Sequence, residues 1–133
     1  MLYREIIEIE TKQGVSFVDI TERVAKAVMN SGIREGLCNV FVTATTAGIT
    51  INESERLLLE DFKRLFKTLV DEKKLYSHPE NAFSHLRASL LSAEKTIPVA
   101  NSKLILGKWQ SILLWEFDVE ERKRQVVVTV TGE

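Results

Sequence analysis

A run of hydroxyl, amide and carboxylate side chains at residues 45–53 has the composition of an anion-binding site. Thr45 and Thr46 bring two hydroxyls, and Gly48 lets a backbone or a ligand approach closely. Asn52 and Glu53 close the run. Threonine hydroxyls and neighbouring backbone amides bind oxygen-rich anions. The same residues also fit a plain β-branched strand with a bulge at Gly48, so both interpretations stay open.

The two histidines, His78 and His85, are the second set of residues with chemical capacity, as metal ligands or as general acids. If one helix carried both, the rings would share a face but lie ~10 Å apart along the axis, too far to bind one metal ion directly. If the helix begins near Asn81, His78 lies in the preceding loop and can fold back towards His85. The plain alternative is a pair of ordinary polar histidines.

The residues beside His78 bear on where this helix starts. Pro79 favours an extended residue before it, which places His78 in a loop. Ser77 and Glu80 can instead form a capping box, which would place His78 inside the helix. We adopt the later start.

Strands and helices that must position these residues are visible as hydrophobic patterns. A helix is expected over 22–30, capped by Thr21 and stopped by Gly32, and the clearest helix spans about 55–71. A third helix runs from near Asn81 through Leu91. The expected strands are 2–11, 15–20 as its hairpin partner, 37–43, 49–51, 96–99, 104–106, 110–118 and 125–131.

The segment 110–118 is apolar at both alternating sets of positions. Such a strand is covered on both faces, by helices or by another subunit. Most of these strands can be joined as hairpins, and strands both precede and follow the helices. We therefore expect an α+β fold, a single domain over 1–133 with a large, mainly antiparallel β-sheet packed against about three helices.

Composition excludes several classes of function. The formal net charge is −1, so no global basic field attracts nucleic acid or anionic lipid. The basic clusters at 63–64, 73–74 and 122–124 are interpreted as solvated faces or turns. The single cysteine, Cys38, lies in an apolar strand and is interpreted as a buried structural thiol. No signal peptide or membrane-length apolar run is visible, so we expect a cytoplasmic protein without membrane or nucleic-acid partners.

Several motifs, in order and at compatible spacings, resemble the YjbQ family, whose members are named secondary thiamine-phosphate synthases. The motifs are Thr45 to Glu53, Tyr76-Ser77-His78, Ser84 to Leu91, Ile97-Pro98-Val99, Leu106 to Gln110 and the closing Gly132-Glu133. The resemblance implies an α+β subunit that assembles as a homotrimer, with the polar motifs near subunit interfaces. It also implies a weak thiamine-phosphate synthase activity.

Three departures from the family pattern concern the site. Ala44 stands where the family has a histidine, no Asp-Pro follows the Asn-Glu pair, and the loop between the two histidines is shorter and less acidic. Two imidazoles therefore remain, with the carboxylates of Glu53 and Glu80. Two histidines and a carboxylate can hold a divalent ion. We expect zinc or magnesium at His78 and His85, weakly bound or absent.

Two functions follow from the resemblance and the residues. The first is transfer of a pyrimidine-methyl group from its diphosphate to a thiazole phosphate. Thr45, Thr46, Gly48 and Asn52 would bind the substrate anion, and His85 and Glu53 would be catalytic. The second is a non-catalytic trimeric protein that binds a small anion or phosphorylated metabolite, which the loss of the family histidine at Ala44 favours.

Overall fold

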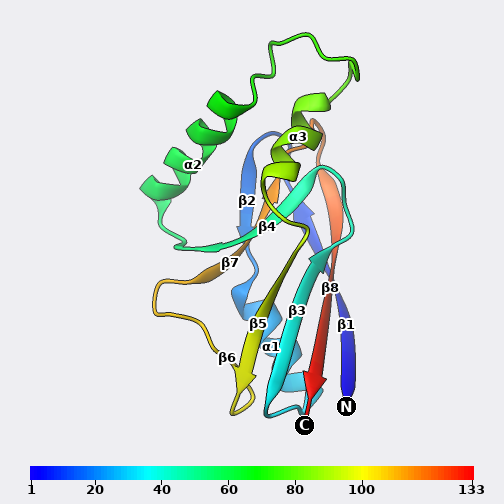
Figure 1. The fold of residues 1–133 in the computed structure, drawn as a ribbon, viewed down its shortest axis with the longest axis vertical. Helices are drawn as coiled ribbons and strands as arrows, with labels where there is room; N and C mark the ends of the chain where they lie inside the picture. Colours follow the sequence, from blue (N-terminus) through cyan, green and yellow to red (C-terminus); the bar gives the residue numbers. More distant parts are fainter.

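Two antiparallel sheets form the framework of the chain, described over residues 1–133 by a computed structural model (Figure 1). The larger sheet has the order β1–β8–β3–β5–β6, and the smaller has the order β2–β7–β4. The strands are β1 (Leu2–Thr11), β2 (Ser16–Asp19), β3 (Gly36–Val42), β4 (Ala47–Asn52), β5 (Glu94–Ala100), β6 (Lys103–Leu104), β7 (Ser111–Glu116) and β8 (Arg122–Gly132). The helices are α1 (Thr21–Ser31), α2 (Arg56–Leu69) and α3 (Ala82–Leu90).

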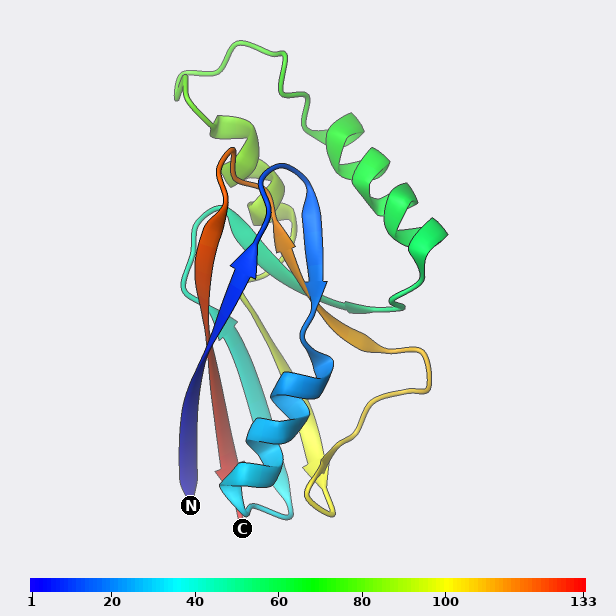
Figure 2. The ribbon, with the colours of Figure 1, turned by 180° about the vertical axis from the view of Figure 1, so that it is seen from behind.

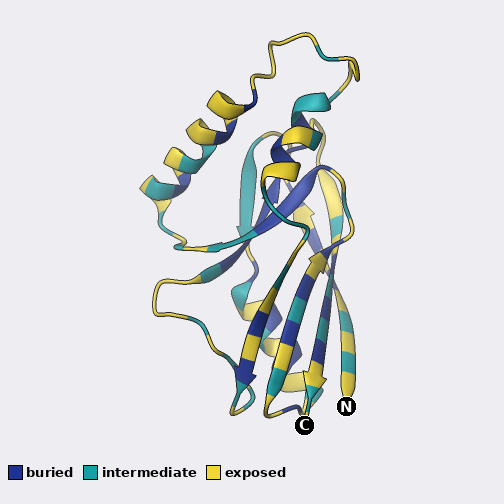
Figure 3. Ribbon diagram, in the orientation of Figure 1, coloured by how far each residue is buried: buried dark blue, intermediate teal, exposed yellow.

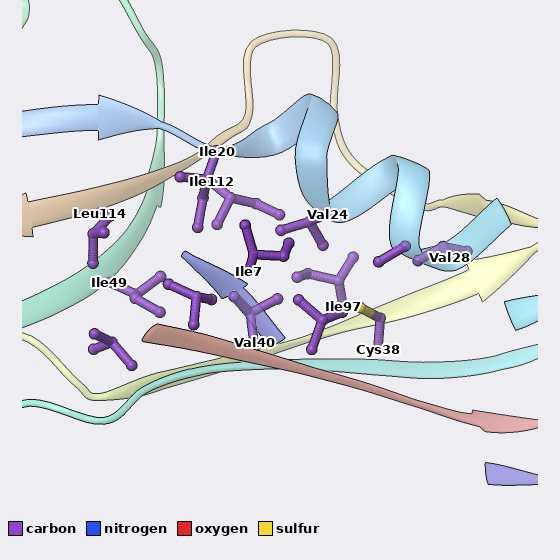
Figure 4. Close-up of a cluster of buried hydrophobic side chains, with 14 of the residues drawn as sticks. Ile7, Ile20, Val24, Val28, Cys38, Val40, Ile49, Ile97, Ile112 and Leu114 are labelled. Atoms are coloured by element: carbon purple, nitrogen blue, oxygen red, sulfur yellow. The ribbon is translucent and has the colours of Figure 1, made fainter. Parts of the chain in front are cut away.

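The main core lies between α1 and the two sheets. Figure 2 shows α1 lying across one face of the larger sheet. Along β8, residues Val126, Val128 and Val130 are fully buried while their neighbours are not, as the period of a strand requires. Figure 4 shows α1 and strands of both sheets contributing aliphatic side chains to this cluster. Cys38 is among them and is fully buried, as predicted, and this burial raises the pKa of its thiol to about 12.

A second core lies between α2 and the other face of β7. Leu59 and Phe66 of α2 pack with Leu113 and Trp115 of β7 and with Phe117. The Phe66 ring meets Trp115 edge-on, with centroids 5.0 Å apart. β7 is therefore buried on both faces, as predicted, and both covers come from the same chain. Figure 3 shows the opposite side of α2 exposed along most of its length.

Strand pairing corrects one sequence-based prediction. β2 was expected as the hairpin partner of β1, but β1 pairs with β8 and β2 pairs with β7. The turn between them, with Gly14 at φ 84°, carries the chain from one sheet to the other, and Gly14 donates its N–H to the Asp118 carbonyl. The alternation of apolar residues predicts a strand but not its partner.

Two local predictions are also corrected. Thr21 was expected to cap α1, yet its hydroxyl donates to Asp19 and accepts the N–H of Ile112, so it ties the helix start to β7. Gly48 was considered as a bulge, but β4 pairs with β7 in a continuous register from Ala47 to Asn52. Gly32 ends α1 in the left-handed conformation, as expected.

The segment between α2 and α3 contains turns but no regular helix or strand. It delivers the chain to α3, whose first helical residue is Ala82 and whose N-cap is Asn81. The later helix start is thereby confirmed, and His78 lies in the loop. Figure 1 shows α3 beside β4, with α2 further out.

The α+β class, the single domain, the antiparallel pairing and the three helices are confirmed. None of the three helices combines the length and the apolar character that crossing a membrane requires.

Candidate functional site

The two histidines lie together at the start of α3. The centroids of the His78 and His85 rings are 5.2 Å apart, and their planes are nearly perpendicular. His85 is half-buried on the helix, whereas His78 is exposed in the preceding loop. The fold therefore brings together two imidazoles that a single continuous helix would have separated.

His85 also separates two adjoining pockets. The first, about 310 Å³, is lined by His78 and His85 together with Tyr76, Ser77, Ala82 and Leu86. The second, about 330 Å³, is lined by His85 on α3 and by the turn before β4, which contributes Ala44 and Thr45. The remaining lining residues are small or apolar, namely Ala47, Ala88, Ser89, Leu91 and Ala93. One imidazole thus faces both an aromatic pocket and a hydroxyl-bearing pocket.

Thr46 points elsewhere, into a buried polar cluster. Its hydroxyl accepts from Arg124 Nη2 at 2.7 Å and lies 3.3 Å from Asp118 Oδ2. Arg124 also donates to both oxygens of Glu116, which has no exposed surface. Thr11 donates to the same carboxylate at 2.6 Å. A buried ion pair with its lone pairs satisfied in this way holds β1, β7, β8 and the Thr45–Thr46 turn in one arrangement.

A chain of hydrogen bonds joins this cluster to His78. Burial raises the pKa of Asp118, but hydrogen bonds from Asn81, the Val119 N–H and Arg122 outweigh it and lower the pKa overall. Asp118 is therefore an ionised acceptor, and Asn81 donates to it through Nδ2 at 3.1 Å. The free Oδ1 of Asn81 lies 2.9 Å from His78 Nε2. Since that amide oxygen only accepts, the proton of neutral His78 lies on Nε2 and its Nδ1 carries the lone pair.

The other predicted site residues, Gly48, Asn52 and Glu53, do not line these pockets. Gly48 is buried, and the space beside its Cα is filled by Leu91 rather than by a ligand. Asn52 is at the far end of β4, about 17 Å along the strand from Ala47 at the usual rise per residue. Its side chain accepts the N–H of Glu53. Within one chain, neither Asn52 nor Glu53 lines the pockets that contain His85.

The chain by itself supplies at most two neighbouring histidine ligands for a metal ion. Two imidazoles bound to one tetrahedral zinc ion have ring centroids about 5 Å apart, which matches this pair. No group of three or more His, Cys, Asp and Glu side chains in the chain could hold a metal ion. The metal site expected at His78 and His85 is therefore not completed by other residues of the chain.

Sequence reasoning missed the residues that support the site. Arg124 was grouped with a solvated basic turn, but its side chain is only 11 % exposed and is paired with Glu116. The available signal was Glu116 itself, a carboxylate inside a strand otherwise apolar on both faces. A buried carboxylate requires a cation, and the nearest arginines along the chain follow the next turn.

The chain is thus an antiparallel α+β domain with two pockets that both include His85, one of them also lined by His78. The chain belongs to the YjbQ-like UPF0047 family, because the family described as "UPF0047 protein YjbQ-like" matches residues 5–133. A UPF0047 protein of Methanothermobacter thermautotrophicus is 40% identical over 98% of this chain and 93% of its own length. Another, from Archaeoglobus fulgidus, is 40% identical over 91% of this chain and 96% of its own.

Solved structures agree in fold. A YbjQ-like protein of unknown function from Sulfolobus solfataricus superposes with a TM-score of 0.91 at 36% identity, covering 100% of both chains. A YjbQ/UPF0047 family protein from Clostridium acetobutylicum superposes with a TM-score of 0.86 at 39% identity, over 94% of this chain and 99% of that one. These similarities confirm the family and the fold predicted from the sequence.

Proposed function

We propose that the chain binds a small phosphorylated metabolite around His85 and carries out a weak transfer of the thiamine-phosphate synthase type. The observation that carries this proposal is the position of His85, which lines both pockets and has an imidazole on one side and the Thr45 hydroxyl on the other. Two adjoining pockets of similar volume suit a reaction between two small substrates.

In that reaction the thiazole nitrogen attacks the methylene carbon of the pyrimidine. The new C–N bond forms as the C–O bond to diphosphate breaks, and pyrophosphate leaves with the electron pair, so no oxidant or reductant is needed. Thr45 donates a hydrogen bond to the departing oxyanion, and His85, when protonated, supplies a positive charge or a proton there. A divalent metal at the two imidazoles would add charge neutralisation at the diphosphate. Tyr76, beside His78, offers an aromatic wall to a planar ring.

The test measures substrate binding and product formation on one purified sample. His85→Gln should abolish turnover and weaken binding of the pyrimidine diphosphate at least about tenfold, since it removes the imidazole that donates a hydrogen bond to the diphosphate. His78→Gln should have a smaller effect, because that ring is exposed and lies in a loop. Thr45→Val should weaken binding, whereas Thr43→Val, a matched change outside both pockets, should not.

Equal losses in both histidine variants, or unchanged binding in Thr45→Val, would contradict the assignment of His85 as the central residue. Circular dichroism of each variant confirms that it remains folded.

A second candidate function is favoured by Ala44. This residue lines the same pocket as Thr45 and His85, so the family histidine that it replaces would have reached that pocket. Removing an imidazole there removes a ligand and a titratable group together. In this alternative the chain is a trimeric protein that binds a small anion without turning it over. Metabolite binding that depends on His85 without product formation would support it.

A further inference from the structure

The face of α3 opposite the histidines carries a buried arginine with most of its hydrogen-bonding capacity unused. The Arg87 side chain is 2% exposed. Its Nη2 donates to the Val70 carbonyl at 2.9 Å, and its Nε has no partner. A guanidinium has five N–H donors, so this arginine is poorly satisfied for its depth.

The only carboxylate paired with Arg87 is held loosely. Glu72 Oε2 lies 3.8 Å from Arg87 Nη1, which is an ion-pair distance but not a hydrogen bond. The Glu72 side chain is 53% exposed and belongs to the irregular segment between α2 and α3. A buried cation ordinarily has charge-assisted hydrogen bonds. Burial, opposed by Glu72, lowers the pKa of this guanidinium, which is consistent with incomplete pairing.

A pocket of about 310 Å³ opens beside Arg87. Lys67 of α2 gives it a second cation, and Phe83 gives it an apolar wall. The guanidinium carbon of Arg87 lies 5.3 Å from the centroid of the Phe83 ring, so that ring also orients the cation. The volume suits a small organic molecule of a single ring.

The two carboxylates of this pocket differ in whether other residues already hold them by hydrogen bonds. Asp118 contributes to its wall, but its carboxylate is occupied by Asn81 and Arg122. Glu72 has no hydrogen bond to Arg87 and is free to swing into water. The position beside Nη1 of Arg87 is therefore held by a displaceable carboxylate.

We propose that this pocket binds a small organic anion, with its carboxylate or phosphate against Arg87 and Lys67 and its apolar ring against Phe83. In the free protein, Glu72 is a weak internal substitute for that oxyanion. The site is independent of the function proposed at His85, because it lies across α3 from the histidines and shares no lining residue with their pockets.

Isothermal titration calorimetry of the full chain with benzoate and with phenyl phosphate tests the proposal. We expect saturable binding of at least one of them with a Kd on the order of 1 mM, and at least about tenfold weaker binding of neutral benzamide. Inorganic phosphate, which lacks the ring, should also bind more weakly. Lys67→Met should weaken binding, whereas Lys63→Met should not, because Lys63 lies one helical turn earlier, is paired with Glu60 and does not line the pocket.

Two further variants should change the affinity for the anion in opposite directions. Arg87→Met should abolish binding. Glu72→Gln should tighten binding about threefold, because it removes the competing carboxylate and its repulsion of the ligand. Glu72 is on the surface, so this result does not depend on whether the Arg87 variant folds.

The proposal is overturned if neither anion gives saturable heat up to about 20 mM, if benzamide binds as well as benzoate, or if Glu72→Gln weakens binding. His85→Gln should leave benzoate binding unchanged, which separates this site from the one around the histidines. Loss of benzoate binding in that variant would also overturn the proposal.

Discussion

At the scale of single residues, the two histidines differ in how strongly the surrounding structure fixes their side chains. His85 is part of α3 and half-buried, whereas His78 is oriented mainly by the Asn81 amide. That amide is in turn oriented by the ionised Asp118. The consequence is a fixed proton position on an otherwise exposed ring.

We predict that neutral His78 is almost entirely in the tautomer protonated at Nε2. Asn81→Ala removes the acceptor, so it should return His78 to a mixture of the two tautomers while leaving His85 unchanged. Nitrogen-15 NMR of the histidine rings at a pH above their titration distinguishes the two forms. A mixture already present at His78 in the unmodified chain would contradict this role for Asn81.

A second prediction concerns Ala44. Ala44→His should raise zinc affinity by about tenfold or more, because it adds an imidazole to a pocket of about 330 Å³ that already contains His85. Calorimetric titration with zinc measures the change. Thr43→His is the matched control, since it adds the same side chain outside that pocket. Tight stoichiometric zinc binding by the unmodified chain would show that the two-histidine site is not weakened.

At the scale of elements, the site depends on close packing between α3 and β4. An added Cβ at Gly48 would lie 2.9 Å from the Leu91 Cβ and 3.1 Å from its Cδ1. The group that approaches Gly48 closely is therefore the Leu91 side chain of the same chain, not a ligand.

Gly48→Ala should destabilise the protein by about 1–3 kcal/mol, the usual cost of overpacking a filled space. Urea denaturation measures this as a lower midpoint. Gly107→Ala serves as the control, because the nearest atom there is the end of the flexible Gln110 side chain at 3.2 Å. Equal stability of Gly48→Ala and the unmodified protein would indicate that α3 shifts without cost.

Elements with a strong local pattern were predictable from the sequence. The periodicity of α2, the doubly apolar β7 and the late start of α3 all follow from neighbouring residues, and each is confirmed. The β1–β8 pairing and the Glu116–Arg124 ion pair depend on long-range register, which no local pattern encodes. The different environments of Thr45 and Thr46 were also not predictable from neighbouring residues. Thr45 lines a pocket, whereas the adjacent Thr46 side chain lies in the buried polar cluster.

At the scale of the whole molecule, the outer face of the larger sheet remains partly apolar. Leu2, Ile6, Leu37 and Phe41 are exposed there. Ile6 and Phe41 both lie opposite Val127 in the register, so they form one row across three strands. Exposed apolar rows of this kind favour association between subunits.

We predict a homotrimer in solution, which would also let Asn52 and Glu53 of one subunit approach the pockets of another. Light scattering at low micromolar concentration should give about three times the 15.1 kDa subunit mass. A monomer mass would contradict the trimer and would leave Asn52 and Glu53 outside the site.

The place of β8 in the larger sheet affects how the chain is made. β8 lies between β1 and β3 and pairs with both, although it follows them by most of the chain. During translation, β1 and β3 therefore leave the ribosome long before the strand that joins them, and their edges stay open until residues 122–132 emerge. The larger sheet can therefore be completed only after β8 has been synthesised. Non-local pairing of this kind folds slowly, so a nascent chain stalled before β8 would be a target for chaperones or aggregation.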